Sequence, residues 1–359
     1  MNFRVLLFII GFLNCAGAGA VLSATNPSDL NSKGLKLAAD GHIQEALPIL
    51  DHAMKAAVKA YGDDDPGTDI IAYNYAKLLL VSGARAMASP ILQHMLDHYI
   101  KRYGKNDPRL AVIYLDLARV NQYSDADHAE RLIHRATALY ESDSHNKDPE
   151  YIRALALLGY VKLWHGNAHA AFRSLRHALG VSAERFGDDS EVTGEVLYRL
   201  GQYYFAIRKY KDAEKEYLRA LEIFDRTVSK TNPNALATHA ALVPVYEKLG
   251  KSDEATKHCV LLGKLAPDAD GDVQPLYRIA PAYPFSAVAT NSEGYVDLRF
   301  TITPEGRVEN LKFVDGRRQS LFENAISKAV SQWRFKPRVI DGHPVASTSE
   351  MRFRFSIDK

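Results

Sequence analysis

Histidines and aspartates at short spacings are the residues best suited to chemistry in this sequence. Three consecutive aspartates occupy positions 63–65, and two histidine pairs have a spacing of four residues: His94 and His98, His165 and His169. Imidazole and carboxylate groups are common ligands of zinc and calcium. Two histidines alone are too few ligands, so surface positions on helices are expected for them. The aspartates precede Pro66, which favours capping of the next helix. No metal site is predicted.

Motifs for catalysis are absent from the sequence. It contains no Gly-rich phosphate loop, no Gly-x-Ser-x-Gly, no His-Glu-x-x-His and no Cys-x-x-Cys. No pair of carboxylates can be placed for acid–base catalysis. We therefore expect no enzymatic activity, no catalytic residues and no small-molecule cofactor.

The composition is that of an ordinary soluble protein with more than one structural unit. The 359 residues are 47% hydrophobic and 25% charged, with a formal net charge of +2. These values do not indicate disorder or a nucleic-acid partner. One of the two cysteines, Cys15, lies in the N-terminal segment, so an internal disulfide is not expected and Cys259 is expected to pack as a small apolar residue.

The first 24 residues have the pattern of a targeting segment. Arg4 precedes an apolar run from Val5 to Leu13, and small residues at 18–20 offer a cleavage site, with a second at 23–24. A cleaved signal peptide is expected. The alternative is a retained membrane anchor, because the apolar stretch 5–24 is long enough to span a bilayer.

The strongest pattern in the chain is self-similarity between residues 25 and 266. Small or compact residues recur at steps of 41 or 42: Gly34, Ala76, Ala118, Gly159, Gly201 and Val243. Two further ladders have the same steps: Ala46, Ala88, Ala129, Ala171, Ala213 and Ala255; and Ala53, Met95, Ala136, Ala178, Ala220 and Leu262. Small residues let helices approach closely, and a helix pair buries its apolar face by stacking on the next pair. A superhelix of about six helix pairs is predicted.

Glycine and proline mark the helix ends in these units. Turn glycines follow the first ladder by seven residues at Gly41, Gly83, Gly166 and Gly250, and prolines open later helices at Pro66, Pro108, Pro149 and Pro233. Each unit is therefore predicted to be helix, short turn, helix, longer turn. The third unit has Ser124-Asp125 in place of the turn glycine, so the geometry of its turn stays open.

The fifth unit resembles a known family. Its segments are Leu-Gly-Gln-Tyr-Tyr at 200–204, Tyr-Lys-Asp-Ala-Glu at 210–214 and Tyr-Leu-Arg-Ala-Leu at 217–221. They resemble a tetratricopeptide repeat (TPR), in a longer variant with extended helices. The resemblance implies an adaptor whose concave face holds peptides or protein surfaces. Candidate groove residues on the first helices are Asn74, Tyr75, Arg119, Lys162, Tyr203 and Tyr204; ordinary helix packing is the alternative for each.

After residue 266 the pattern changes from helix to strand. Residues 267–276 are predicted to form a linker, because 268–275 is acidic and contains glycine and proline. Apolar residues then alternate with polar ones over 296–302, a turn follows at 304–306, and a second strand over 307–314 shows a slip that indicates a bulge. A helical stripe from Leu321 to Trp333 precedes a third strand, 351–357. Hairpin, helix and third strand predict a small α+β domain over 277–359.

This domain resembles the TonB C-terminal domain. The residues that carry the resemblance are Pro-Ala-Tyr-Pro at 281–284, Glu-Gly-Tyr-Val at 293–296, Ala-Val-Ser-Gln-Trp-Arg-Phe-Lys-Pro at 329–337 and Asp-Gly-His-Pro-Val at 341–345. The family carries force or contact from the inner membrane to outer-membrane receptors, and is thought to pair a sheet edge with an extended receptor peptide. Met351, Arg352, Phe353, Arg354 and Phe355 are the candidate edge strand. Edge protection against aggregation is the alternative role for the two arginines.

The sequence as a whole predicts a periplasmic scaffold of a Gram-negative bacterium. Its partners would be envelope proteins or peptides, including an outer-membrane receptor segment, in the service of envelope transport. The alternative is an energy transducer of the TonB type anchored in the inner membrane. Full transducers of this family carry a Pro-rich spacer, whereas helical repeats take its place here.

Overall fold

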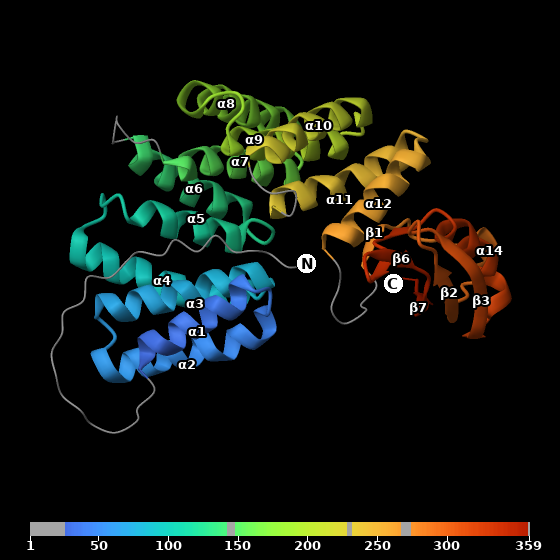
Figure 1. The fold of residues 1–359 in the computed structure, drawn as a ribbon, viewed down its shortest axis with the longest axis horizontal. Helices are drawn as coiled ribbons and strands as arrows, with labels where there is room; N and C mark the ends of the chain where they lie inside the picture. Colours follow the sequence, from blue (N-terminus) through green and yellow to red (C-terminus); the bar gives the residue numbers. More distant parts are fainter. Residues whose placement is uncertain (1–25, 142–147, 228–231, 267–273, 358–359) are drawn as a thin grey trace. The chain divides into compact units, whose positions relative to one another are not determined.

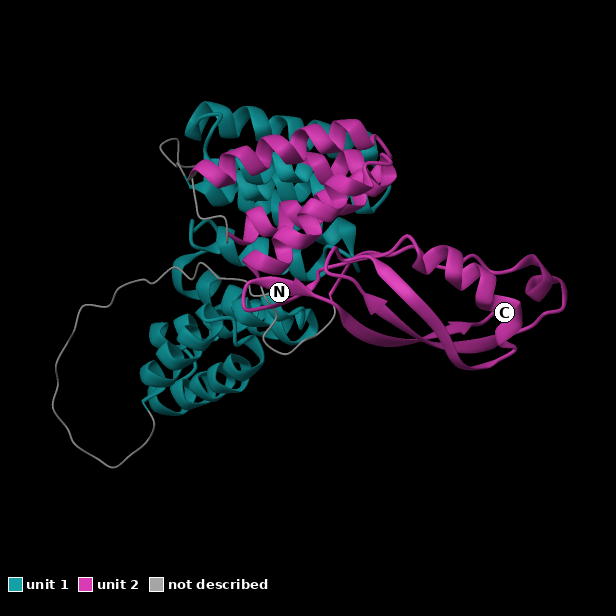
Figure 2. Cartoon of the chain, turned by 45° about the vertical axis from the view of Figure 1, so that its right-hand side comes forward, with its two compact units in different colours: residues 1–199 teal, residues 200–359 magenta. Residues whose placement is uncertain are grey.

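The computed structural model describes residues 26–141, 148–227, 232–266 and 274–357 (Figure 1). The predicted signal peptide or anchor, residues 1–24, lies outside the described residues, as do 267–273 of the predicted linker. By contacts the chain divides into two units, residues 1–199 and 200–359, and the boundary falls inside helix α9 (Figure 2). None of the helices in the described ranges is both long and apolar enough to cross a membrane.

Helices fill the first part of the chain, as the periodicity predicts. The first six are α1 (Pro27–Ala39), α2 (Ile43–Tyr61), α3 (Pro66–Ser82), α4 (Arg85–Tyr103), α5 (Leu110–Asn121) and α6 (Ala126–Glu141). The next six are α7 (Pro149–Trp164), α8 (Ala168–Phe186), α9 (Glu191–Ala206), α10 (Tyr210–Thr227), α11 (Pro233–Lys248) and α12 (Ser252–Leu265). Pro66, Pro149 and Pro233 each stand in the first turn of a helix, preceded by a capping Asp or Asn side chain.

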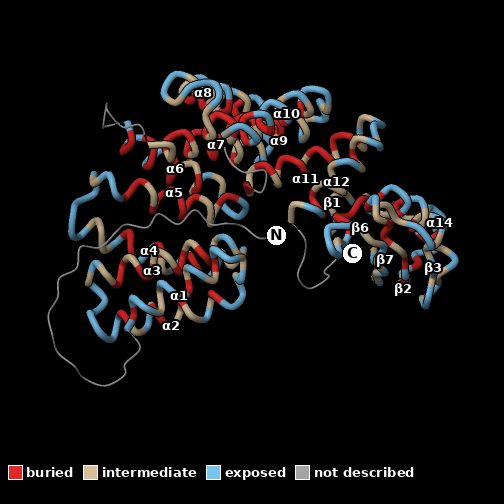
Figure 3. The backbone as a smooth tube through the Cα atoms, viewed as in Figure 1, coloured by how far each residue is buried: buried red, intermediate tan, exposed pale blue. Residues whose placement is uncertain are grey.

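The three ladders form the interior of the helix pairs. All of their residues are buried, and the six alanines of the second ladder are fully inaccessible (Figure 3). Glycines of the first ladder face a large residue sixteen positions later: a Cβ added at Gly159 would lie 2.6 Å from Leu175 Cγ, and one at Gly201 would lie 2.5 Å from the ring of Tyr217. The missing side chain therefore permits the close approach of the two helices in each pair.

The turns show where glycine is required. Gly41, Gly83, Gly166 and Gly250 all have positive φ, which glycine adopts without steric cost. In the fifth unit Arg208 adopts φ 61° at the equivalent position. The third unit solves the turn differently, because no residue of its turn appears among those with positive φ.

The C-terminal region is a small α+β structure. Its strands are β1 (Pro275–Tyr277), β2 (Gly294–Ile302), β3 (Val308–Arg317), β4 (Arg334–Phe335), β5 (Arg338–Ile340), β6 (His343–Val345) and β7 (Ser347–Phe355). Its helices are α13 (Phe285–Ala289) and α14 (Gln319–Val330). Strands β3, β2 and β7 form an antiparallel sheet in that order, while β1 pairs with β4 and β5 with β6.

The predicted slip in the second strand is a bulge. Arg299 pairs with Lys312 but Thr301 pairs with Glu309, so β3 has one extra residue opposite β2 in this interval. Asn310, inside this interval, has φ 50°. The bulge turns the side chains of β3 without breaking the hairpin.

One face of the sheet carries the core of this region. Val296, Leu298, Phe300 and Ile302 of β2 pack in one cluster with residues of α14 and with Trp333 and Phe335. The rings of Phe322 and Phe355 stack at 4.1 Å between centroids. Trp333 and Phe335 are among the most deeply buried side chains of this core.

The predicted fold class, a helical repeat array followed by a small α+β domain, is confirmed. The difference lies in the short elements. β1 begins at Pro275, inside the predicted linker, and pairs with β4. Strands of two or three residues are too short for an alternation of polar and apolar residues to reveal them.

Candidate partner-binding surfaces

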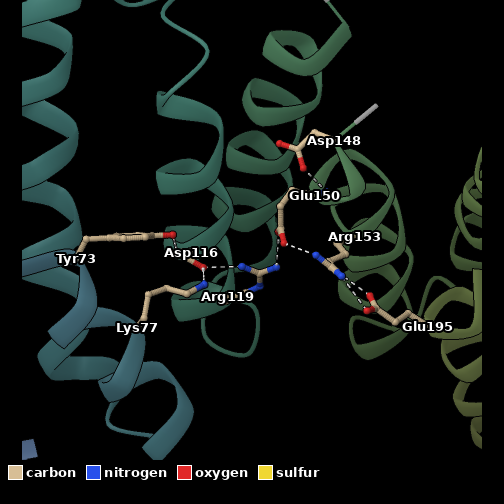
Figure 4. A network of polar contacts seen from close by, with 8 residues as sticks. All are labelled: Tyr73, Lys77, Asp116, Arg119, Asp148, Glu150, Arg153 and Glu195. Carbon is tan, nitrogen blue, oxygen red and sulfur yellow. Dashed lines mark hydrogen bonds and ion pairs between the residues drawn. The ribbon is translucent and has the colours of Figure 1, made fainter. Parts of the chain in front are cut away.

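A polar network crosses four first helices of the repeat array in the first unit. On α5, Asp116 accepts hydrogen bonds from the Tyr73 hydroxyl (2.8 Å) and from Lys77 Nζ (3.2 Å), both on α3 (Figure 4). Arg119, one turn further along α5, donates to Asp116 at 2.5 Å. The charges of neighbouring repeats therefore meet on a shared carboxylate.

The network continues along the first unit through alternating charges. Arg119 Nη2 lies 3.4 Å from Glu150 of α7, which also accepts from Arg153 Nη1 at 2.7 Å. Arg153 then donates two hydrogen bonds to Glu195 of α9, at 2.8 and 2.9 Å. A bidentate arginine–carboxylate pair fixes both partners in orientation. The ion pairs between successive first helices therefore set the register of neighbouring repeats.

Asp116 is the most buried charge in this network. Its side chain is 0% exposed. Burial alone would raise the pKa of the carboxyl, but Lys77, Arg119 and the Tyr73 hydroxyl outweigh it and hold the pKa below its ordinary value. Burial and the Asp116 charge raise the pKa of Tyr73 well above its ordinary value, so this hydroxyl stays protonated as a donor.

The predicted groove residues fall into two groups. Tyr75 and Tyr203 are buried, and Arg119 belongs to the polar network. Asn74 donates to the side chain of Asn31 at 3.1 Å, and Lys162 lies 2.9 Å from Glu130. The remaining residue, Tyr204, is half-buried with its ring against that of Tyr203. Tyr75, Tyr203 and Arg119 are therefore engaged in contacts within the repeat array. Asn74, Lys162 and Tyr204 keep part of their surface exposed, where a partner could contact them.

An exposed aromatic cluster was missed by the sequence reasoning. Tyr123, in the turn after α5, packs edge-on against Trp164 of α7 and shares a 3.1 Å hydrogen bond with the hydroxyl of Tyr160. Trp164 is 59% exposed. The guanidinium of Arg85 lies 5.1 Å from the centre of the Tyr123 ring. The four-residue spacing of Tyr160 and Trp164 was the available signal, and exposed aromatic residues beside arginine are typical of protein interfaces.

The predicted edge strand lies at the margin of the sheet. β7 pairs with β2 on one side, and no other strand of the described residues pairs with it. Its side chains alternate: Met351, Phe353 and Phe355 face the core cluster, while Arg352 and Arg354 are exposed. The backbone of the outer edge and the two arginines are therefore the parts that a partner could reach.

Arg352 is held on the outer face of the sheet by its neighbours. It donates two hydrogen bonds of 2.6 Å to Asp297 on β2, and its guanidinium lies 4.4 Å from the centre of the Tyr295 ring. The hydrogen bonds from Arg352 lower the pKa of Asp297. A second cross-strand pair, Arg299 with Glu350 at 2.6 Å, lies on the same strands.

Comparison with known proteins bears on the C-terminal region first. Residues 279–357 match the family model described as the Gram-negative bacterial TonB protein C-terminal. The region is a TonB C-terminal domain. Protein TonB of Pseudomonas aeruginosa is 37% identical over 90 residues, which are 25% of this chain and 26% of that protein. The chain thus spans about a quarter of the length of this curated relative.

The solution NMR structure of the Pseudomonas aeruginosa TonB C-terminal domain is 36% identical, with a TM-score of 0.23, and covers 25% of this chain and 92% of that one. Residues 150–226 match the tetratricopeptide repeat family, so the helical array is a TPR region. A kinesin light chain of Podosopora anserina with TPR-like repeats covers 56% of this chain and 95% of that one, at 15% identity and a TM-score of 0.47.

The second unit joins the last repeat to the TonB C-terminal domain through the Trp-Arg-Phe-Lys-Pro segment. Arg334 Nε lies 2.9 Å from Glu247 Oε1 on α11, with side chains only 4% and 9% exposed. Lys336 Nζ donates to the carbonyl of Ala266 at 2.9 Å. Trp333 and Phe335 point into the core while the two basic residues fasten the domain to the repeat.

Backbone approaches tighten the same junction. A Cβ added at Gly263 of α12 would lie 2.8 Å from the carbonyl oxygen of Pro337, and one at Gly306 would lie 3.2 Å from Cys259 Cβ. Cys259 is fully buried, as predicted, and burial raises the pKa of its thiol to about 12. The thiol is therefore a packing group at this junction.

Proposed function

We propose that the chain is a non-enzymatic scaffold of the Gram-negative cell envelope that serves transport across the outer membrane. In this proposal the TonB C-terminal domain pairs with an extended segment of an outer-membrane receptor, and the TPR region holds a second protein. A TonB C-terminal domain fits a location in the cell envelope. The observation that carries the proposal is the open outer edge of β7 in a domain of this family.

The edge has the features of a strand-addition site. β7 is nine residues long and lies on a three-stranded sheet, so an added peptide would become the fourth strand. Backbone hydrogen bonds would supply the affinity, while exposed side chains on alternate positions would supply selectivity. Arg352 is already paired with Asp297, which leaves Arg354 as the better contact for an acidic residue of the peptide.

The test measures binding of the full chain, by NMR, to synthetic peptides that copy extended segments of outer-membrane receptors from the same organism. We expect binding to shift the backbone amide resonances of β7 more than those of β3, and N-methylation of alternate peptide residues to abolish binding. Arg354→Glu should lower the affinity for an acidic peptide by about tenfold. Lys312→Glu, on the exposed face of the opposite edge strand, should leave that affinity unchanged. Equal shifts on both edges, or equal losses in both variants, would refute the edge proposal.

The alternative function is energy transduction by an anchored chain. The similarity to Protein TonB and the apolar stretch 5–24 favour it, since a transducer must stay in the inner membrane. The N-terminal mass of C-terminally tagged protein from fractionated cells decides between the two. A start at Val21 or Thr25 in the periplasmic fraction supports the scaffold, and an intact Met1 in the inner membrane supports the transducer.

For the TPR region we propose that the exposed aromatic cluster of Tyr123, Tyr160 and Trp164 in the first unit forms a partner surface. Trp164 carries the argument, because large exposed rings are typical of energetic centres in interfaces, and it packs against Tyr123, whose ring lies beside Arg85. Asn74 and Lys162 of the first unit and, separately, Tyr204 of the second unit are the remaining candidates from the sequence. Trp164→Ala should abolish capture of an envelope protein by the tagged chain, whereas Tyr61→Ala, an exposed aromatic residue at the end of α2, should not. Unchanged capture by Trp164→Ala would exclude the cluster.

A further inference from the structure

The three aspartates at 63–65 do not share one task. Asp65 caps α3, since its side chain accepts from Gly67 N at 2.7 Å. Asp63 and Asp64 turn instead toward α4: Asp63 Oδ2 lies 3.0 Å from His94 Nε2, and Asp64 Oδ1 lies 2.7 Å from His98 Nε2. Capping, the role that the sequence predicts for all three, thus explains one of them.

The two histidines present their ligand atoms to a common point. One helical turn separates them on α4, and their ring centroids are 4.2 Å apart. The ligand atoms of Asp63, His94 and His98 all lie within 4.8 Å of one another. Nitrogen and oxygen ligands bind zinc at about 2.0–2.2 Å, so atoms at this separation can close around one ion after a small movement of the exposed aspartate.

A buried carboxylate stands behind His98. The Nδ1 atom of His98 is buried without a hydrogen-bond partner, and Asp69 Oδ1 of α3 lies 3.7 Å from it. Asp69 is itself buried and lies 3.4 Å from Arg102 Nη1. A metal-bound histidine typically donates its second ring N–H to a carboxylate, which orients the ring. A small rotation of His98 would complete this arrangement, with Nε2 toward the ion.

We propose that Asp63, His94 and His98 form a binding site for a divalent transition metal of the zinc type, with Asp64 as a further oxygen ligand and Asp69 as the positioning residue. Two imidazoles with carboxylates suit zinc and its first-row neighbours better than calcium or magnesium, which prefer oxygen alone. The ion would tie the turn between the first two helix pairs to α4. The role of the ion would be structural, with its ligands supplied by the chain and by water.

The experiment titrates Zn²⁺ into the metal-stripped chain, purified without a histidine tag, by calorimetry. Cobalt absorption serves as a second readout of nitrogen and oxygen ligation. We expect the chain to bind one equivalent of zinc tightly, and we expect His94→Ala and Asp63→Ala each to lower the affinity at least tenfold. Both residues are largely exposed, so these variants should fold normally.

Two matched controls separate this site from ordinary surface histidines. His42 and His134 are also exposed and each faces a single glutamate, at 3.1 and 3.4 Å. The variants His42→Ala and His134→Ala should still bind one equivalent of zinc with the affinity of the unchanged chain. The proposal is overturned if the unchanged chain binds no zinc tightly, or if the control variants lose as much affinity as His94→Ala.

Discussion

At the scale of single residues, Asp116 is the charge on which the polar network depends. It is fully buried and receives hydrogen bonds from three side chains on two helices. Removing one member of a buried ionic cluster leaves the others without compensation, which costs about 3–5 kcal/mol. Asp116→Ala should therefore lower the free energy of unfolding by about that amount, as measured by chemical denaturation.

The control for Asp116 is an exposed pair. Asp51 accepts from Lys55 at 2.6 Å across one turn of α2, and solvent screens such exposed pairs strongly. Asp51→Ala should shift the denaturation midpoint only slightly. A similar loss in both variants would mean that the network contributes little beyond a surface pair.

His258 gives the chain a pH dependence. It lies 2.7 Å from His239 between the two Nδ1 atoms, and burial together with the neighbouring histidine lowers its pKa from 6.5 to about 4. The unfolded chain takes up this proton near pH 6.5, whereas the folded chain resists it. Stability should thus be complete above that pH and fall as the pH drops toward 4.

The measurement is the melting temperature as a function of pH. Wild-type protein should lose melting temperature between pH 6.5 and 4, and His258→Gln should flatten that part of the curve. An unchanged slope in the variant would assign the loss to other groups.

At the scale of the elements, the small residues of the first ladder set the distance between paired helices. A Cβ at Gly159 would lie 2.6 Å from Leu175 Cγ and 3.2 Å from the carbonyl oxygen of Ala171. Overpacking of this kind typically costs about 1–3 kcal/mol. Gly159→Ala should be destabilising by that amount in thermal unfolding, although alanine is the better helix former.

Gly180 is the matched control in the same repeat. It lies within α8, and a Cβ there would meet nothing within 4 Å. Gly180→Ala should stabilise the protein by about 0.5–1 kcal/mol through helix propensity alone. If both substitutions stabilise, the close approach at Gly159 does not limit the packing.

Periodicity made most of the elements predictable from the sequence. The alanine ladders, the turn glycines and the alternation in β2 each repeat at a spacing that a single type of structure explains. The contacts of Arg119 were not predictable in this way. Its partners Asp116 and Glu150 lie 3 and 31 residues away in the sequence. Only the three-dimensional stacking of the repeats shows that Arg119 bridges two of them.

The same limit applies to the candidate sites. The sequence could place Arg352 on an exposed strand face, because alternation fixes the face, but its pairing with Asp297 depends on strand register. Asp63 and His94 are 31 positions apart and meet only because the turn after α2 folds back on α4. Exposure of Trp164 likewise depends on neighbours that periodicity does not reveal.

At the scale of the whole molecule, the last repeat and the TonB C-terminal domain lie in one compact unit, and we expect them to unfold together. The buried pair of Arg334 and Glu247 crosses the junction. Glu247→Ala would leave the Arg334 guanidinium buried without its carboxylate, at a cost of about 3–5 kcal/mol. We expect this variant to show separate unfolding of the domain in calorimetry.

Asp253 provides the control at the same junction. It lies 3.6 Å from Arg307 but is almost fully exposed, so Asp253→Ala should leave the unfolding profile as it is. Independent unfolding of the domain in the wild-type chain would show that the junction does not couple the two parts.

The polar network also limits how the gene can change. TPR arrays can gain or lose members by duplication and deletion of whole units, provided that neighbouring units are interchangeable. Here they are not: the unit of α3 supplies Tyr73 and Lys77, that of α5 supplies Asp116 and Arg119, and that of α7 supplies Glu150 and Arg153. Excision of the α5 unit would leave Tyr73 and Lys77 without Asp116, and Glu150 without Arg119. The number and order of these units should therefore be inherited as a block.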